Sequence, residues 1–140
     1  MDADRLDRFV FGDDVADVGR ARDYAEHVLR HTPHGAPARA EIVLVVSELV
    51  TNAIRHAGGH GALRLVVGLD GVRIQVDDHQ PRLRPRSTDV NQNGGRGLAL
   101  VAAISARWGV VTRHDGKTVW AECRRHSHPV GATWPSIRDD

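Results

Sequence analysis

The stretch Glu41–His56, EIVLVVSELVTNAIRH, carries the pattern that decides the fold. Its apolar residues recur at intervals of three and four, which predicts an amphipathic helix with one face against a core. Those positions are Ile42, Val45, Val46, Leu49, Ala53 and Ile54. Residues four apart share a helix face, so Glu48, Asn52 and His56 project together. A carboxylate beside a carboxamide can polarise a hydroxyl and hold a hard cation such as Mg²⁺. An ordinary solvated helix face would also carry such residues, so this segment alone leaves both interpretations open.

The bulk composition narrows the class of protein. A chain of 140 residues forms one domain that buries about two-thirds of its unfolded surface. With 19 basic and 18 acidic side chains the formal net charge is +1, which disfavours a general polyanion binder or a membrane-surface protein. The single cysteine, Cys123, excludes an internal disulfide framework and indicates a buried structural thiol in a reducing compartment. No apolar run approaches the ~20 residues of a membrane span, and an acidic N-terminus is unlike a signal peptide. We therefore expect a cytoplasmic protein.

The remaining pattern predicts strands in hairpins with helices between them. The expected elements are a strand at 6–11, helices at 15–32 and from Pro37 to Gly58-Gly59, strands at 63–69 and 72–76, a loop at 81–93, a helix at 98–106, and strands at 107–113 and 117–123. Asp13 and Asp14 are expected to cap the first helix. Asp70-Gly71 and Asp115-Gly116 mark the two hairpin turns.

This order predicts an α+β fold, a two-layer sandwich of a mostly antiparallel sheet with helices on one face. A parallel Rossmann sheet is disfavoured, because its strands would alternate with helices one by one. We expect one domain at residues 1–124 and an irregular tail at 125–140, which Trp134 and Ile137 are able to pin to the body. The loop at 81–93 is longer than most connections, and such loops often serve as lids or binding segments.

Glycines precede the third predicted helix, in the run Gly94-Gly95-Arg96-Gly97-Leu98. Glycines at a helix start let main-chain N–H groups approach an anion, and the positive end of the helix attracts phosphate. Arg96 would add a charged contact. An ordinary turn is the alternative, and the run is not a dinucleotide fingerprint because no strand directly precedes it.

Two further motifs carry possible ligand contacts. Gly116-Lys117-Thr118 looks like the end of a P-loop, but Val111 stands where that pattern needs a glycine. We therefore expect the tripeptide to form the hairpin turn and the first residues of the last strand. Thr118, expected to face inward, could still hydrogen-bond a ligand. Asp77 and Asp78 end the strand beside the long loop. A carboxylate at this position can accept a hydrogen bond from an exocyclic amine such as that of adenine. The alternative is an aspartate that only forms a turn or caps a helix.

The histidines are not expected to form a metal site. Gly58-Gly59 break the helix between His56 and His60, while His126 and His128 lie in the tail.

Taken together, these pieces resemble the GHKL ATPase superfamily, which has the Bergerat fold, and most closely the small bacterial anti-sigma-factor serine/threonine kinases. SELVTNAIRHA at 47–57 resembles the N box, Val76 to Pro81 the first glycine box, GGRGLALV at 94–101 the second, and GKTVWAE at 116–122 the closing strand. The similarity covers about Glu41 to Glu122. The N box and the glycine-helix segment at this separation form its most specific part.

The resemblance implies a role for each matching residue. Asn52 would bind Mg²⁺ that bridges the phosphates of ATP, and Glu48 would be the general base. Asp78 would accept a hydrogen bond from the adenine amino group, supported by Thr118. Alternation from Ile74 and Val76 favours Asp78 inward, with Asp77 as the alternative. The other implied ATP-binding residues are His56, Gly95, Arg96, Gly97 and Leu98, with the loop at 81–93 as a lid.

One departure concerns the first glycine box, which normally reads Asp-x-Gly. Here it is Asp78-His79-Gln80, so a side chain stands where the backbone passes close to the nucleotide. Weaker adenine binding, or a pocket used without turnover, would follow. His79 could also modulate the carboxylate of Asp78.

The function implied by the resemblance is an ATP-dependent serine/threonine kinase in transcription control. It would bind a sigma factor, phosphorylate an antagonist protein and form a homodimer, without direct nucleic-acid or membrane contact. The alternative is a non-catalytic, nucleotide-gated or nucleotide-free protein-binding module. A sensor histidine kinase is less expected because no phospho-accepting helical domain precedes the module, and a topoisomerase or chaperone ATPase would need a transducer domain.

Overall fold

The helices and strands expected from the sequence are present in residues 8–79 and 95–125, the part of the chain that the structure, a computed structural model, describes. In chain order they are β1 (Phe9–Phe11), α2 (Ala16–Leu29), α3 (Ala36–Ala57), β2 (Gly61–Val67), β3 (Gly71–Asp78), α4 (Gly95–Ile104), β4 (Arg107–Arg113) and β5 (Gly116–Arg124). The expected lid at 81–93 and the tail beyond Arg125 lie outside the described residues.

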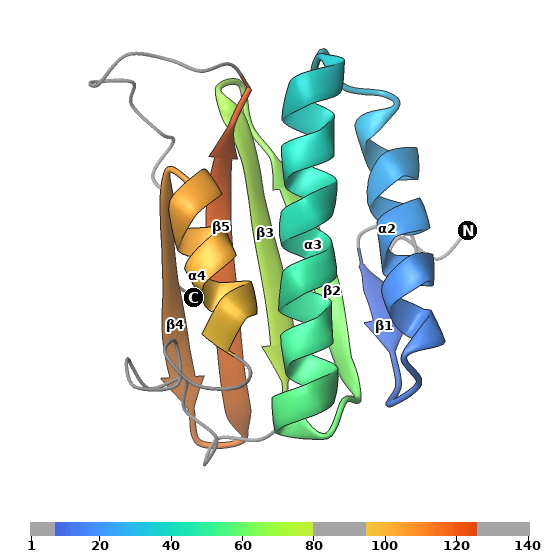
Figure 1. The fold of residues 1–140 in the computed structure, drawn as a ribbon, viewed down its shortest axis with the longest axis vertical. Helices are drawn as coiled ribbons and strands as arrows, with labels where there is room; N and C mark the ends of the chain where they lie inside the picture. The colour runs from blue at the N-terminus through green and yellow to red at the C-terminus, as the bar shows by residue number, and fades with distance from the viewer. Residues whose placement is uncertain (1–7, 80–94, 126–140) are drawn as a thin grey trace.

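The strands form one antiparallel sheet in the order β1-β2-β3-β5-β4. All three helices lie on the same side of this sheet (Figure 1). The predicted two-layer α+β sandwich is therefore confirmed. Side chains alternate along each strand, which gives the sheet a helix face, with Ile74 and Val76 of β3, and an outer face, with Arg73 and Gln75.

The core between the two layers is built around α3, as the period of its sequence predicted. Ile42, Val45, Val46 and Leu49 are at most 1% exposed and pack against the helix face of the sheet. Gly58 ends the helix in the left-handed conformation at φ 77°, which glycine adopts without a steric penalty. Within residues 8–79 and 95–125, no helix combines the length and the apolar character that crossing a bilayer requires.

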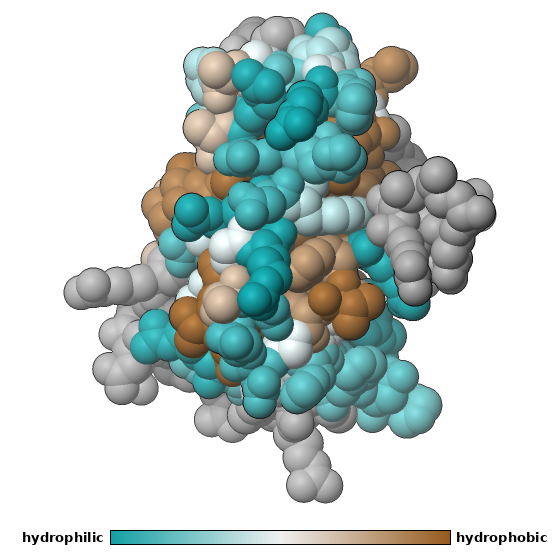
Figure 2. Space-filling view, turned by 90° about the vertical axis from the view of Figure 1, so that its right-hand side faces the viewer, coloured by the Kyte–Doolittle hydropathy of each residue, from teal (hydrophilic) through white to brown (hydrophobic). Residues whose placement is uncertain are grey.

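The first helix differs from its prediction at its start. The helix begins at Ala16, and Val15, expected on the apolar stripe, is 73% exposed at the N-cap. Asp14 nevertheless supports the first turn, because its Oδ1 accepts a hydrogen bond from the Ala16 amide at 2.9 Å. Hydrophilic residues cover most of the side of the molecule that bears α2 (Figure 2).

The two hairpin turns lie slightly earlier than predicted. Gly68 to Asp70 form the first turn, closed by the Gly68 amide donating to the Gly71 carbonyl at 2.8 Å. Gly71 and Gly116 are instead the first residues of β3 and β5. Gly116 is needed for close strand approach rather than for the turn, since a Cβ there would overlap the Asp78 carbonyl oxygen.

Candidate functional site

The sequence-predicted site residues come from elements that meet at one end of the molecule. There α3 and β3 end while α4 and β5 begin (Figure 1). Helix α4 packs against α3, and β5 pairs with β3. This topology brings the last turns of α3 to the same end of the fold as the start of α4, although about 40 residues of sequence separate them.

Glu48 and Asn52 lie one turn apart on α3, and both are partly buried. Their neighbours Leu49 and Ala53 belong to the core, which holds this section of the helix in place. In residues 8–79 and 95–125 no hydrogen bond or ion pair occupies the side chain of Glu48 or Asn52. Their oxygen atoms therefore keep hydrogen-bonding capacity for a ligand. His56, one further turn along, is exposed.

Asp78 is turned inward, as alternation along β3 predicted, and its side chain is 2% exposed. Its Oδ2 lies 2.6 Å from the Nζ atom of Lys117, which is also buried at 6% exposure. The sequence interpretation missed Lys117 because it expected the next residue, Thr118, to face inward, which would turn Lys117 outward. Alternation along β5 carries the missing signal, since Val119, Ala121 and Lys117 have the same parity.

Thr118 does not support Asp78, which corrects the expectation that it faces inward beside that carboxylate. In the antiparallel register Asp78 pairs with Lys117, and Asp77 pairs with Thr118. Thr118 Oγ1 donates to Asp77 Oδ1 at 2.5 Å on the outer face, and Arg113 Nη1 lies 3.5 Å from the same oxygen. The physical reason is that neighbouring residues of a strand point to opposite faces of the sheet.

The glycine-helix segment forms the start of α4, whose first residue is Gly95. The side chain of Leu98 is 4% exposed and belongs to the core, so only its main chain is available for a phosphate. The side chain of Arg96 lies outside the described part of the structure, and its phosphate contact stays a prediction.

The available donors suit Mg²⁺ better than a metal held entirely by protein. In the described part of the chain, no group of three His, Cys, Asp or Glu side chains could hold a metal ion. Mg²⁺ in nucleotide sites is bound through one or two protein oxygens together with phosphates and water. The amide oxygen of Asn52 and the carboxylate of Glu48 fit that requirement.

Two surface hollows lie elsewhere on the molecule. One runs between α2 and α3 and is lined by residues that include Arg22, Arg39 and Leu44. The other lies between the start of α3, the end of α4 and Arg124. Neither is lined by Glu48 or Asn52, so neither belongs to the candidate site.

Comparison with known protein families matches residues 11–123 to the histidine kinase-like ATPase domain. The chain belongs to this family. The match runs from the last residue of β1 almost to the end of β5 and confirms the predicted GHKL resemblance. As a histidine kinase-like ATPase domain, the chain is a module of the ATP-binding type.

Individual relatives and solved structures are also similar to the chain. A Streptomyces coelicolor protein described as uncharacterized is 39% identical over 83 residues, which cover 55% of this chain and 79% of that protein. The solved structure of the RsbU and RsbW domains of Rv1364c from Mycobacterium tuberculosis aligns with a TM-score of 0.65 at 19% identity, over 84% of this chain and 31% of that one. The histidine kinase domain of the Erythrobacter litoralis EL346 blue-light activated histidine kinase gives a TM-score of 0.51 at 23% identity, and the alignment covers 78% of this chain and 63% of that one.

These structural likenesses establish the fold of this histidine kinase-like ATPase domain. The chain spans about a third of the Mycobacterium tuberculosis chain, so the activity of that whole protein does not transfer with the fold.

Proposed function

We propose that this chain is an ATP-dependent serine/threonine kinase of the anti-sigma-factor type. It would phosphorylate an antagonist protein and sequester a sigma factor. The observation that carries the proposal is the pair Glu48 and Asn52 on α3, partly buried and unengaged among the described residues. The likeness to a structure that contains an RsbW domain supports the regulatory part.

Each proposed contact follows from the position of its residue. Asp78 accepts a hydrogen bond from the adenine amino group at the inner end of β3. Main-chain N–H groups at Gly95, Gly97 and Leu98 donate to the phosphates at the start of α4, where the helix dipole also attracts them. Arg96 adds a positive charge to the same phosphates, and His56 lies at the solvent side of the site.

Catalysis in this proposal depends on Glu48 and Asn52. The side-chain oxygen of Asn52 would hold Mg²⁺, which would neutralise phosphate charge. The Glu48 carboxylate takes the proton from the incoming serine hydroxyl as that oxygen bonds to the γ-phosphorus and the β-γ bridging oxygen leaves. Partial burial of Glu48 limits the access of water to this proton transfer.

The partners in this proposal are a sigma factor and an antagonist protein carrying the phosphorylated serine or threonine. The proposed state is a cytoplasmic homodimer.

A pair of variants on α3 tests the kinase role. Glu48→Gln should keep the thermal shift produced by Mg-ATP and lose at least ~100-fold in labelled-phosphate transfer to an antagonist protein. Asn52→Ala should lose the Mg²⁺-dependent part of the thermal shift. Glu41→Gln, an exposed carboxylate on the same helix, is the control and should behave like the parent. Undiminished transfer by Glu48→Gln would refute the role of general base.

The second candidate is a non-catalytic module that sequesters a protein partner, gated by nucleotide or independent of it. The ion pair between Asp78 and Lys117 favours it, because one oxygen of the proposed adenine acceptor is already occupied. The altered box Asp78-His79-Gln80 favours it too. Calorimetry with Mg-ATP separates the candidates: binding without transfer to any antagonist, or no binding, supports the module.

A further inference from the structure

The hollow between α2 and α3 combines an apolar floor with a charged rim. The two helices lie side by side on the same side of the sheet (Figure 1), and the hollow between them has a volume of about 570 Å³. Its floor comes from α3, at positions three and four residues apart that lie off the core-facing stripe. These positions are Ala36, Ala40, Val43 and Leu44. Leu44 is 39% exposed, so the floor offers apolar surface to an occupant.

Four charged side chains form the rim of this hollow. Arg22, Glu26 and Arg30 follow at intervals of four along α2 and its C-cap, and Arg39 lines the hollow from α3. Three arginines against one carboxylate leave an excess of two positive charges, and arginine keeps its charge at any physiological pH. A concave surface lined mainly by one sign of charge concentrates the potential and attracts the opposite sign. The hollow therefore favours a negatively charged occupant.

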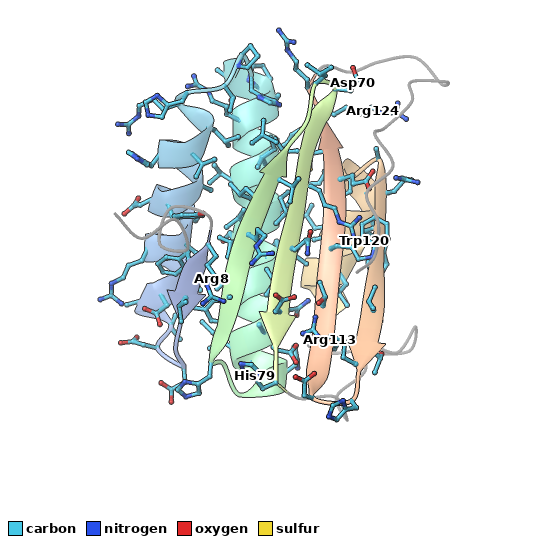
Figure 3. All side chains as sticks on the ribbon, turned by 180° about the vertical axis from the view of Figure 1, so that it is seen from behind. Arg8, Asp70, His79, Arg113, Trp120 and Arg124 are labelled. Atoms are coloured by element: carbon cyan, nitrogen blue, oxygen red, sulfur yellow. The ribbon has the colours of Figure 1, made fainter. Side chains whose placement is uncertain are left out.

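The rim arginines differ from the arginines in the middle of the outer face of the sheet. On that face, which is turned toward the viewer in Figure 3, Arg107 Nη2 lies 2.9 Å from Glu122 Oε1, and Arg73 Nη1 lies 3.9 Å from the same oxygen. In residues 8–79 and 95–125, by contrast, no hydrogen bond or ion pair engages the side chain of any rim arginine. Their N–H groups can therefore donate to carboxylates of a partner.

The dimensions and charge of the hollow indicate the shape of its occupant. Its lining on α3 runs from Ala36 to Ser47, about 16 Å along the helix axis, which is the length of three helical turns. An apolar groove of this kind accepts the apolar stripe of an amphipathic helix. A second copy of the chain is a poor occupant, because two-fold pairing would place this basic rim opposite itself.

We propose that the hollow docks an amphipathic helix of a partner protein, with carboxylates on both sides of its apolar stripe. The stripe packs on Val43 and Leu44. The carboxylates accept hydrogen bonds from Arg22 and Arg30 on one side and from Arg39 on the other. This inference goes beyond the proposed kinase function and does not depend on it, because none of the residues proposed to bind ATP lines the hollow.

Titration of the ¹⁵N-enriched full chain with two designed peptides tests the proposal. The probe contains leucine, alanine and glutamate, with leucines every three and four residues and glutamates beside them. The control peptide has the same composition without that spacing. We expect the probe to bind at least ~10-fold more tightly, with amide shifts at Ala40 and Leu44 and none at Val110 on β4. Equal affinity of the two peptides, no detectable binding at about 1 mM, or shifts confined to the sheet would overturn the proposal.

One pair of leucine variants tests the floor. Leu44→Ser should weaken binding of the probe at least ~5-fold, because it removes the exposed apolar contact. Leu69→Ser is the matched control, since Leu69 is 88% exposed in the turn between β2 and β3, and its affinity should equal that of the parent. A loss of affinity that is the same in both variants would count against the floor as the contact surface.

Two double variants test the rim. Arg30→Gln with Arg39→Gln should weaken binding at least ~5-fold, whereas Arg8→Gln with Arg64→Gln removes the same charge elsewhere and should leave the affinity unchanged. Equal losses would show a general charge effect and overturn the assignment to the hollow. Shifts at Leu44 that grow with protein concentration in the absence of peptide would assign the hollow to a second copy and overturn it as well.

Discussion

Removing the ammonium group of Lys117 should destabilise the fold more than any change on the exposed sheet surface. Lys117→Met keeps an unbranched apolar side chain and leaves the carboxylate of Asp78 without its cation. The two side chains are 6% and 2% exposed and the Nζ–Oδ2 distance is 2.6 Å. Breaking a buried pair from one side costs about 3–5 kcal/mol, because the remaining charge stays buried while it loses the attraction of its partner.

The assay is urea unfolding followed by circular dichroism at pH 7. At this chain length a loss of 3 kcal/mol corresponds to a fall of roughly 10 °C in Tm. Asp78→Asn should cost a similar amount, and the double variant should cost at least ~2 kcal/mol less than the sum of the single changes. The matched control is Arg113→Met, whose ion pair with Asp77 spans 3.5 Å at 41% and 34% exposure. That change should cost under ~1 kcal/mol.

Strict additivity of the two single variants would refute the argument, since it would mean that Asp78 and Lys117 do not interact in solution. A cost for Lys117→Met no larger than that of the control would refute it as well. The same variants bear on ATP: if Lys117 competes with adenine for Asp78, the Mg-ATP thermal shift of Lys117→Met exceeds that of the parent.

Three further outcomes follow from single positions. Gly59→Ala should lower the free energy of unfolding, measured with urea, by more than ~2 kcal/mol, because φ is +76° and a Cβ would overlap Gly12. Gly19→Ala has open space around it in α2 and should raise the free energy of unfolding by about 0.5–1 kcal/mol. Equal effects of the two substitutions would contradict this reasoning. Burial raises the pKa of the Cys123 thiol to about 12, so a thiol reagent at pH 8 should react at least ~100-fold more slowly with the folded than with the unfolded chain. The stabilisation of the fold that this pKa shift contributes is present below pH 9.0 and should be lost as the pH rises toward 12. The Gly12 amide, then Arg20, lowers the pKa of Asp17 below 3.8; its stabilisation is present above that pH and lost below it, so Asp17→Asn should flatten the acid limb of a pH–stability curve.

Much of the fold could be predicted because local periodicity and tertiary packing agree. The apolar stripe of α3 has the helical period, and its positions are the ones that the core buries. The hairpins were marked by Asp-Gly pairs, although Gly71 and Gly116 proved to be strand residues. Glycine in these sequences signals either a turn or a close strand approach, and only the register between strands distinguishes the two.

The outer face could not be predicted from the sequence in the same way. The charged cluster on this face joins residues that are distant along the chain, namely Arg73, Arg107 and Glu122. The sequence pattern predicts an ordinary solvated strand residue at each of these positions. Their cluster depends on β5 lying between β3 and β4, a strand order in which β5 separates β3 from the next strand along the chain. Local patterns carry no information on that order, so the burial of Arg73 and Glu122 emerged only with the topology.

In the candidate site, side-chain alternation was applied to β3 but not to β5, and only the residue on β3 was assigned to the correct face of the sheet. Alternation from Ile74 placed Asp78 inward, and the structure agrees. The same rule applied from Val119 places Lys117 inward and Thr118 outward, contrary to the expectation that Thr118 faces inward. Because Thr118 is bound to Asp77 on the other side of the sheet, any residue that assisted Asp78 in the proposed adenine recognition would have to act beside, or in place of, Lys117. The inner end of β5, rather than Thr118, is therefore where nucleotide affinity should respond to mutation.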